Sequence, residues 1–125
     1  MAVRAHLARV NLEATDPQAE IRRLLALARY PNVWVKVSEL SVLSPSKTYP
    51  YRDTFDLVKQ VHKAFGPDRL LWGTGFPGAT RAQAARPSLQ QELDLIRKEV
   101  PFLTAQDREK ILGRNAANLW GFEAR

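Results

Sequence analysis

The chain has 125 residues, of which 45% are hydrophobic and 26% charged, a composition typical of a single soluble globular domain. It contains no cysteine, so disulfides and thiolate metal sites are excluded, and any metal would need His, Asp or Glu as ligands. The net charge of +6 would suit a nucleic-acid binder, but the basic residues are scattered, which favours a solvated surface and predicts no nucleic-acid partner.

The first predicted unit is a strand followed by a helix. Residues 2–10, with the sequence AVRAHLARV, are short and apolar enough for a strand. Residues 16–30 carry apolar side chains at helical spacing, and Asp16 and Pro17 stand where an N-cap and a first helical residue are expected. This order of elements is typical of an α/β protein.

A second unit of the same kind follows. Residues 32–38, NVWVKVS, are β-branched and aromatic and are predicted to form a strand. Residues 50–66 place apolar side chains on one face of a predicted helix, which we expect to end at Gly66.

The third strand is predicted at residues 69–74, RLLWGT, and helices follow it to the end of the chain. In residues 87–100, Ser88 and Gln91 have the spacing of a capping box at a helix start. Two shorter helices are predicted at residues 104–113 and 115–122.

Strands alternating with helices predict an α/β fold of parallel βαβαβα units in one domain, residues 1–125. Parallel strands need cover on both faces, and the common solutions use five or more strands in an open sheet or eight in a closed barrel. Only three strands are visible. The sequence therefore predicts either an unusually small α/β domain or the C-terminal part of a larger one.

The longest irregular segments, residues 39–50 and 73–87, each follow a predicted strand. In parallel α/β folds the ligand site lies at the carboxyl ends of the strands, and long loops there are more often functional than incidental. We therefore expect the functional residues of this chain in or beside these two loops.

Three segments carry a resemblance to a known family: YPNVWVKVSEL, PYRDTFDLVKQVHKAFGPDRLLWGTGFP and LTAQDREKILGRNAANLWGF. In this order they resemble the C-terminal part of the amidohydrolase-related family of metal-dependent TIM-barrel hydrolases, which includes decarboxylases of aromatic acids and lactonases. The most specific feature is FGPDRLLWGT-x-FP in combination with ILGRNAANLWGF. The resemblance implies that the three strands are the last of a (β/α)8 barrel, which would be incomplete in this chain.

The chemistry implied by the resemblance is hydrolysis at a divalent metal, commonly zinc. In the family the metal lies at the barrel mouth, bound by an early His-x-His pair and a later His, and a carboxylate of the last strand takes the proton of the attacking water. A metal lowers the pKa of bound water and a nearby carboxylate accepts its proton. The implied reaction is cleavage of a C–O, C–N or C–C bond in a small, carboxylated substrate.

Carried over residue by residue, the resemblance is uneven. His6 resembles the later, strand-borne His and is the predicted metal ligand, the alternative being a packed, hydrogen-bonded core residue. Ala5 replaces the Asp that precedes it in the family, and the early His-x-His pair has no counterpart. In the family pattern WG[ST]D[FY]PH, Gly75 replaces the carboxylate and Gly78 the His. The catalytic group is thus unknown. Three interpretations stay open: chemistry by another residue, a non-catalytic relative, or a fragment that is inactive alone and holds no metal.

Four residues are predicted to bind substrate. Lys36 would meet an anionic substrate in the barrel lumen, the alternative being a surface lysine on an edge strand. Ser38 and Thr74 would donate hydrogen bonds to a ligand, the alternative being turn capping. Arg81, like Arg86, would bind a carboxylate, the alternative being a solvent-facing position.

The competing hypothesis is a non-enzymatic α/β module that self-associates as a homo-oligomer to complete its sheet, because three strands leave unpaired edges. On either hypothesis we predict a cytoplasmic protein with no membrane partner. No apolar run approaches the length of a membrane span, and charges interrupt the apolar residues at the N-terminus. A hydrolase of this kind would have a small-molecule substrate as its partner.

Overall fold

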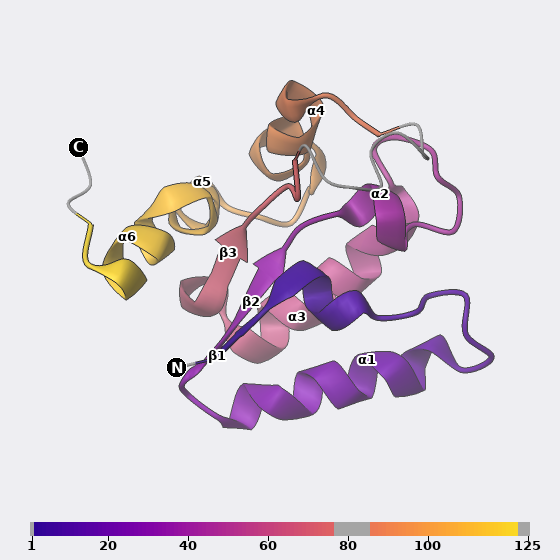
Figure 1. The fold of residues 1–125 in the computed structure, drawn as a ribbon, viewed down its shortest axis with the longest axis horizontal. Coiled ribbons are helices and arrows are strands. Elements are labelled where there is room, and N and C mark those ends of the chain that lie inside the picture. Colours follow the sequence, from indigo (N-terminus) through magenta and orange to yellow (C-terminus); the bar gives the residue numbers. More distant parts are fainter. Residues whose placement is uncertain (1, 77–85, 123–125) are drawn as a thin grey trace.

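A parallel sheet of three short strands lies at the centre of the fold, in a computed structural model that describes residues 2–76 and 86–122 (Figure 1). The strands are β1 (Ala2–Arg4), β2 (Val33–Val37) and β3 (Leu70–Trp72), in the spatial order β1-β2-β3. Val3 pairs with Trp34 and Val35 with Leu70. The chain is thus α/β with parallel strands, as predicted, and the sheet does not close on itself within the described residues.

The two faces of the sheet differ in burial. Val33, Val35 and Val37 of β2 are buried, whereas Trp34 and Lys36 between them are half-buried on the opposite face. Successive side chains of a strand point to opposite faces, so the alternation places the three valines in the core. Each buried valine contributes about 1.5–3 kcal/mol.

Two long helices contribute to this core, α1 (Pro17–Leu25) and α3 (Phe55–Phe65), and both lie on one side of the sheet (Figure 1). The side chain of Asp16 accepts a hydrogen bond from the Ala19 amide at 3.0 Å, so the predicted N-cap is confirmed. Gly66 ends α3 with a φ of 76°, a conformation that favours glycine, as predicted. The buried residues of these helices are Ile21, Leu24, Leu57, Val58, Val61 and Phe65.

The remaining helices are short: α2 (Leu40–Leu43), α4 (Leu89–Asp94), α5 (Ala105–Glu109) and α6 (Asn115–Trp120). Wide π-helical turns continue α4 through Leu95–Glu99 and join α5 to α6 through Lys110–Arg114. Both α4 and α5 begin with a capping box, Ser88 with Gln91 and Thr104 with Asp107. Among the described residues, no helix combines the length and the apolar character needed to cross a membrane.

The first strand is shorter than predicted. The sequence predicts a strand over residues 2–10, but β1 ends at Arg4, and Ala5–Arg9 form a tight turn. His6, Leu7, Ala8 and Arg9 have φ angles of 52–54°, in the left-handed region. The left-handed conformation costs about 1–2 kcal/mol for each residue that is not glycine, so it is not expected in a segment without glycine. The apolar pattern of the segment therefore gave no sign of the turn. His6 therefore lies beyond the end of β1 and not within it.

Candidate functional site

The candidate site lies at the edge of the sheet where all three strands end. Because the strands are parallel, the residues that follow each of them meet at this edge. The residues that the structure brings together there are His6 after β1, Lys36, Ser38 and Glu39 at the end of β2, Gly73 and Gly75 after β3, and Arg86. We call this end of the sheet the carboxyl edge.

His6 contacts two residues that follow β2. Its Nδ1 lies 2.8 Å from Ser38 Oγ and 3.7 Å from Glu39 Oε2. A Ser-His-acid triad needs the serine and the acid on opposite ring nitrogens. Here both lie at Nδ1, and Ser38 is only 2% exposed. Ser38 is therefore a buried partner of His6 and not a nucleophile activated by it.

The environment of His6 lowers the pKa of its imidazole below the usual value of 6.5. Burial is the main cause, and the positive charges of Lys36, Arg9 and Arg86 act in the same direction, while Glu39 opposes them. The ring is therefore neutral at pH 7. A neutral imidazole keeps one nitrogen as an acceptor, which is the form that binds a metal or accepts a proton.

Glu39 and Arg86 form a shielded ion pair. Arg86 Nη2 lies 3.2 Å from Glu39 Oε1, and the side chains are only 4% and 13% exposed, respectively. The alternative that Arg86 faces solvent is therefore wrong. Sequence reasoning missed Glu39 altogether, because nothing in its local sequence distinguishes it from a loop residue. The only feature that could have drawn attention to Glu39 is its position just after the predicted strand, at residues 32–38.

Two glycines of β3's loop make room for side chains of β2. At Gly73, a Cβ atom would lie 2.8 Å from Lys36 Cε. At Gly75, which has a φ of 66°, it would lie only 2.1 Å from Glu39 Oε1. At either position a side chain would displace the end of Lys36 or Glu39, so these two side chains occupy the space that the glycines leave open.

The other predicted substrate-binding residues have mixed outcomes. β2 is the middle strand, so the alternative of Lys36 on an edge strand is wrong. Thr74 Oγ1 accepts a hydrogen bond from the Phe76 amide at 3.0 Å, which is the turn-capping alternative. Arg81 and Gly78 lie outside the described residues. The substrate-binding roles of Lys36, Ser38, Thr74 and Arg81 stay predictions.

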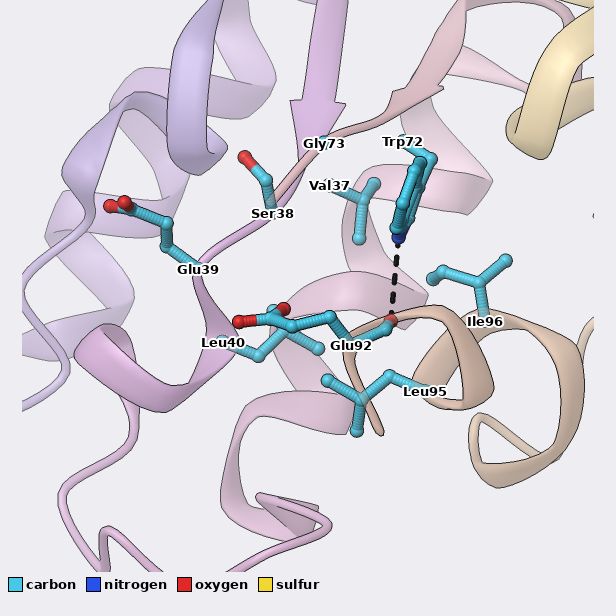
Figure 2. A pocket seen from close by; sticks show the side chains of 9 residues that line it. All are labelled: Val37, Ser38, Glu39, Leu40, Trp72, Gly73, Glu92, Leu95 and Ile96. Atoms are coloured by element: carbon cyan, nitrogen blue, oxygen red, sulfur yellow. Dashed lines mark hydrogen bonds between the residues drawn. The ribbon is translucent and has the colours of Figure 1, made fainter. Parts of the chain in front are cut away.

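A small cavity lies beside the site (Figure 2). The centre of a water molecule can move within a volume of about 10 Å³ there, which is enough for about one water and too little for a substrate. On its far side, Trp72 Nε1 donates to the backbone oxygen of the buried Glu92 at 3.4 Å. Figure 2 shows the Glu39 carboxylate directed away from Trp72 and Glu92. The cavity is lined by Val37, Ser38, Glu39, Leu40, Trp72, Gly73, Glu92, Leu95 and Ile96.

The described residues do not by themselves fit a metal ion. His6 and Glu39 are two candidate ligands that lie together, whereas a catalytic zinc is bound by three protein side chains. No group of three or more His, Asp or Glu suited to a metal occurs in residues 2–76 and 86–122. In addition, the charge of Glu39 is already paired with Arg86. A metal here would need ligands from elsewhere.

Comparison with known proteins identifies the family. A family model described as amidohydrolase matches residues 2–122, nearly the whole chain. The chain therefore belongs to the amidohydrolase family.

Two curated relatives are hydrolases of the same named activity. The chain is 32% identical over 117 residues to 4-sulfomuconolactone hydrolase of Rhizobium radiobacter and 29% identical over 120 residues to that of Hydrogenophaga intermedia. Each match covers 93% of this chain but only 38% and 37% of the relative, respectively. The chain thus spans less than half the length of the relatives that it matches.

Solved structures share the fold. An amidohydrolase from Burkholderia multivorans superimposes with a TM-score of 0.80 at 21% identity, over 97% of this chain and 44% of that protein. A second crystal form of it contains bound zinc. A putative 2-pyrone-4,6-dicarboxylic acid hydrolase from Pseudomonas putida matches with a TM-score of 0.76 at 26% identity, over 98% of this chain and 44% of that protein.

Proposed function

We propose that this chain carries part of the active site of a hydrolase that opens a lactone bearing an acidic group. The similar proteins of Rhizobium radiobacter, Hydrogenophaga intermedia and Pseudomonas putida are named as hydrolases of cyclic esters that carry sulfonate or carboxylate groups. In this proposal β1, β2 and β3 are three neighbouring strands of a (β/α)8 barrel, and the carboxyl edge is part of the barrel mouth.

The observation that carries the proposal is the convergence of a neutral imidazole and two cations at the ends of parallel strands. His6 contacts Ser38 and Glu39, Arg86 is paired with Glu39, and Lys36 extends across Gly73. Lysine is a point charge that attracts carboxylate or sulfonate groups. We assign Lys36 to the acidic substituent of the substrate.

A metal ion would supply an activated water in a hydrolase of this family. The described residues do not by themselves fit such an ion, so we assign no step to it. His6 is placed to exchange a hydrogen bond with the reacting ester, because its ring is neutral and fixed by Ser38. The fixed ring orientation is what Ser38 contributes.

The test is hydrolysis of 2-pyrone-4,6-dicarboxylate and of 4-sulfomuconolactone by a complete barrel that contains these three strands, with and without added zinc. We expect ring opening of at least one of them. Lys36→Met should raise KM by about 10-fold to 100-fold, because the lost ion pair with an anionic group is worth about 1.5–3 kcal/mol. Lys59→Met, at an exposed position of α3, is the matched control and should leave KM unchanged. No hydrolysis of either lactone under both conditions would contradict the proposal.

The open sheet favours a second candidate, self-association to complete the sheet. In the described residues β1 and β3 each have one side unpaired, and such edges readily accept another strand. Analytical ultracentrifugation distinguishes the two. An oligomer that dissociates only on unfolding supports assembly, whereas a monomer at micromolar concentration rules it out.

A further inference from the structure

Glu39 has a backbone conformation that an acidic residue does not favour. Its φ and ψ are 56° and 38°, in the left-handed region, at the junction between β2 and α2. Its carbonyl accepts hydrogen bonds from the Val42 and Leu43 amides, which fixes it as the start of α2. A glycine would adopt this conformation without the cost of about 1–2 kcal/mol that a side chain adds. Strain of this kind persists only where the surrounding structure imposes the conformation, and it occurs most often at functional sites.

The side chain of Glu39 is held in one place by its neighbours. Its Oε1 is paired with Arg86 at 3.2 Å, and its Oε2 lies 3.7 Å from His6 Nδ1. Only 13% of the side chain is exposed. Figure 2 shows the carboxylate on the opposite side of the β2 end from Trp72. The group is therefore oriented and largely shielded from water, but it still borders the open edge through His6.

Gly75 and Glu39 are sterically linked. A Cβ at Gly75 would lie 2.1 Å from Glu39 Oε1, 3.0 Å from its Cδ and 3.3 Å from its Cγ. A side chain at residue 75 and the Glu39 carboxylate in its present position therefore exclude each other. The loop of β3 lacks a carboxylate where a carboxylate from β2 is already present.

We propose that Glu39 is the proton-accepting carboxylate of the site, which reaches from the end of β2 into the space that Gly75 leaves open. This assignment rests on the proposed hydrolase function. In the reaction, Glu39 takes a proton from water while the water oxygen bonds to the lactone carbonyl carbon. The bond between that carbon and the ring oxygen then breaks, and the proton passes to the ring oxygen. Water and lactone are thus converted to a hydroxy acid without a further reactant.

The assignment predicts an effect of Gly75→Asp opposite to the one that the sequence alone would suggest. Restoring an aspartate at residue 75 looks like a repair of the family pattern, but in this structure the new side chain would collide with Glu39. We therefore expect Gly75→Asp to be more harmful when Glu39 is present than when Glu39 is replaced by glycine, although the φ of 66° at residue 75 strains a side chain in both backgrounds.

The test is a double-mutant cycle of Glu39→Gly, Gly75→Asp and the two together, with Glu39→Gln as the conservative variant. Glu39→Gln should lower kcat by about 100-fold or more, with KM within about threefold, because a general base contributes roughly 10²–10⁴ in rate. Glu39→Gly and Gly75→Asp should each lose a similar factor. The double variant should recover to within about tenfold of the parent protein. Glu20→Gln on α1, also an ion-paired glutamate, is the control and should keep full activity.

Thermal unfolding is the second readout, since it does not depend on activity. Gly75→Asp should lower Tm in both backgrounds, because the φ of 66° at residue 75 strains any side chain, and should lower it by roughly 5 °C more in the parent than in the Glu39→Gly background. Equal shifts in both backgrounds would overturn the contact between the two positions. Unchanged kcat in Glu39→Gln would overturn the catalytic role. Absence of hydrolysis by the parent would overturn the proposed function and this role with it, while the thermal cycle would still decide the contact.

Discussion

The two ends of the sheet are built from different kinds of contact. At the end where the strands begin, Arg69 donates hydrogen bonds to the backbone oxygens of Phe65, Tyr30 and Ala28 at 3.1, 2.7 and 2.9 Å. Asn115 Nδ2 likewise donates to the backbone oxygens of Pro67 and Leu70. At the carboxyl edge, by contrast, His6 contacts Ser38 and Glu39, and Glu39 contacts Arg86, through their side chains.

This difference separates a structural end from a functional one. A side chain that bonds backbone carbonyls fixes the chain and leaves no group for a ligand. At the carboxyl edge, ionisable side chains meet one another, and His6 and Glu39 are in left-handed conformations. Strained residues and paired ionisable groups are the features expected of a site that binds or reacts. The comparison predicts that substitutions at the first end reduce stability and those at the carboxyl edge reduce activity.

The largest effect on stability is expected for Arg69→Ala. The guanidinium stacks on Phe65 at 5.0 Å and donates to backbone carbonyls in two segments that precede strands, so its loss removes these hydrogen bonds and the link between the two segments. Hydrogen bonds of a charged group are worth about 1.5–3 kcal/mol each. We expect the free energy of unfolding to fall by about 3–5 kcal/mol in urea denaturation.

The matched control for Arg69→Ala is Arg29→Ala. Arg29 also stacks on an aromatic ring, that of Tyr30, and bonds its hydroxyl, but both residues are exposed. Its loss should cost less than about 0.5 kcal/mol. If the two variants were equally destabilised, the anchoring role of Arg69 would be wrong.

An intermediate effect on stability is expected when acid protonates Asp53 in the segment that follows α2. Ser44 Oγ and the Ser46 amide donate to the Asp53 carboxylate at 2.6 and 2.8 Å. Burial by itself would raise the pKa of Asp53, but these hydrogen bonds outweigh it and hold the pKa below the usual value. The carboxylate therefore stabilises the fold above about pH 5, and this contribution is lost as the pH falls through the folded-state pKa.

The test compares the parent with Asp53→Asn over a range of pH. At pH 7 the variant should be less stable by about 0.7 kcal/mol, a value reduced for solvent screening of an exposed group. As the pH falls through the lowered folded-state pKa the difference should vanish, because the parent carboxylate then becomes protonated as well. Asp56→Asn, on the exposed start of α3, is the control and should show a smaller difference. A difference in the free energy of unfolding between the parent and Asp53→Asn that stayed constant with pH would contradict this account.

Much of the fold follows from local signals in the sequence. The strand at Val33–Val37 alternates β-branched residues, and the caps at Asp16, Ser88 and Thr104 each depend on residues within three positions. The same local reasoning failed at residues 5–9, because apolar composition cannot reveal a turn held by contacts to another strand. Leu7 is fully buried in that turn, which is why the segment looked like a strand.

The candidate site was less predictable, because its central contacts join positions far apart in the sequence. His6 and Lys36 follow from the resemblance and from alternation, respectively. Glu39 could not be predicted in either way, because its contacts are with Arg86, 47 residues away, and with the space beside Gly75 in the neighbouring loop. The sequence shows a missing carboxylate at Gly75, and only the parallel pairing of β2 with β3 shows a second carboxylate beside it.

The smallest change in the free energy of unfolding is expected for Ala8→Gly, which should stabilise the fold instead of destabilising it. Ala8 is exposed and has a φ of 54°, in the left-handed turn that carries His6. Glycine removes the left-handed cost of about 1–2 kcal/mol but adds about 0.5–1 kcal/mol of unfolded-state entropy, so we expect a net gain of about 0.5 kcal/mol. Ala64→Gly, at an exposed position of the right-handed helix α3, should instead lose about 1 kcal/mol. Chemical denaturation of both variants measures the contrast. A loss in both would mean that the turn after β1 stores no strain, and the difference in backbone strain between the two ends of the sheet would then depend on Glu39.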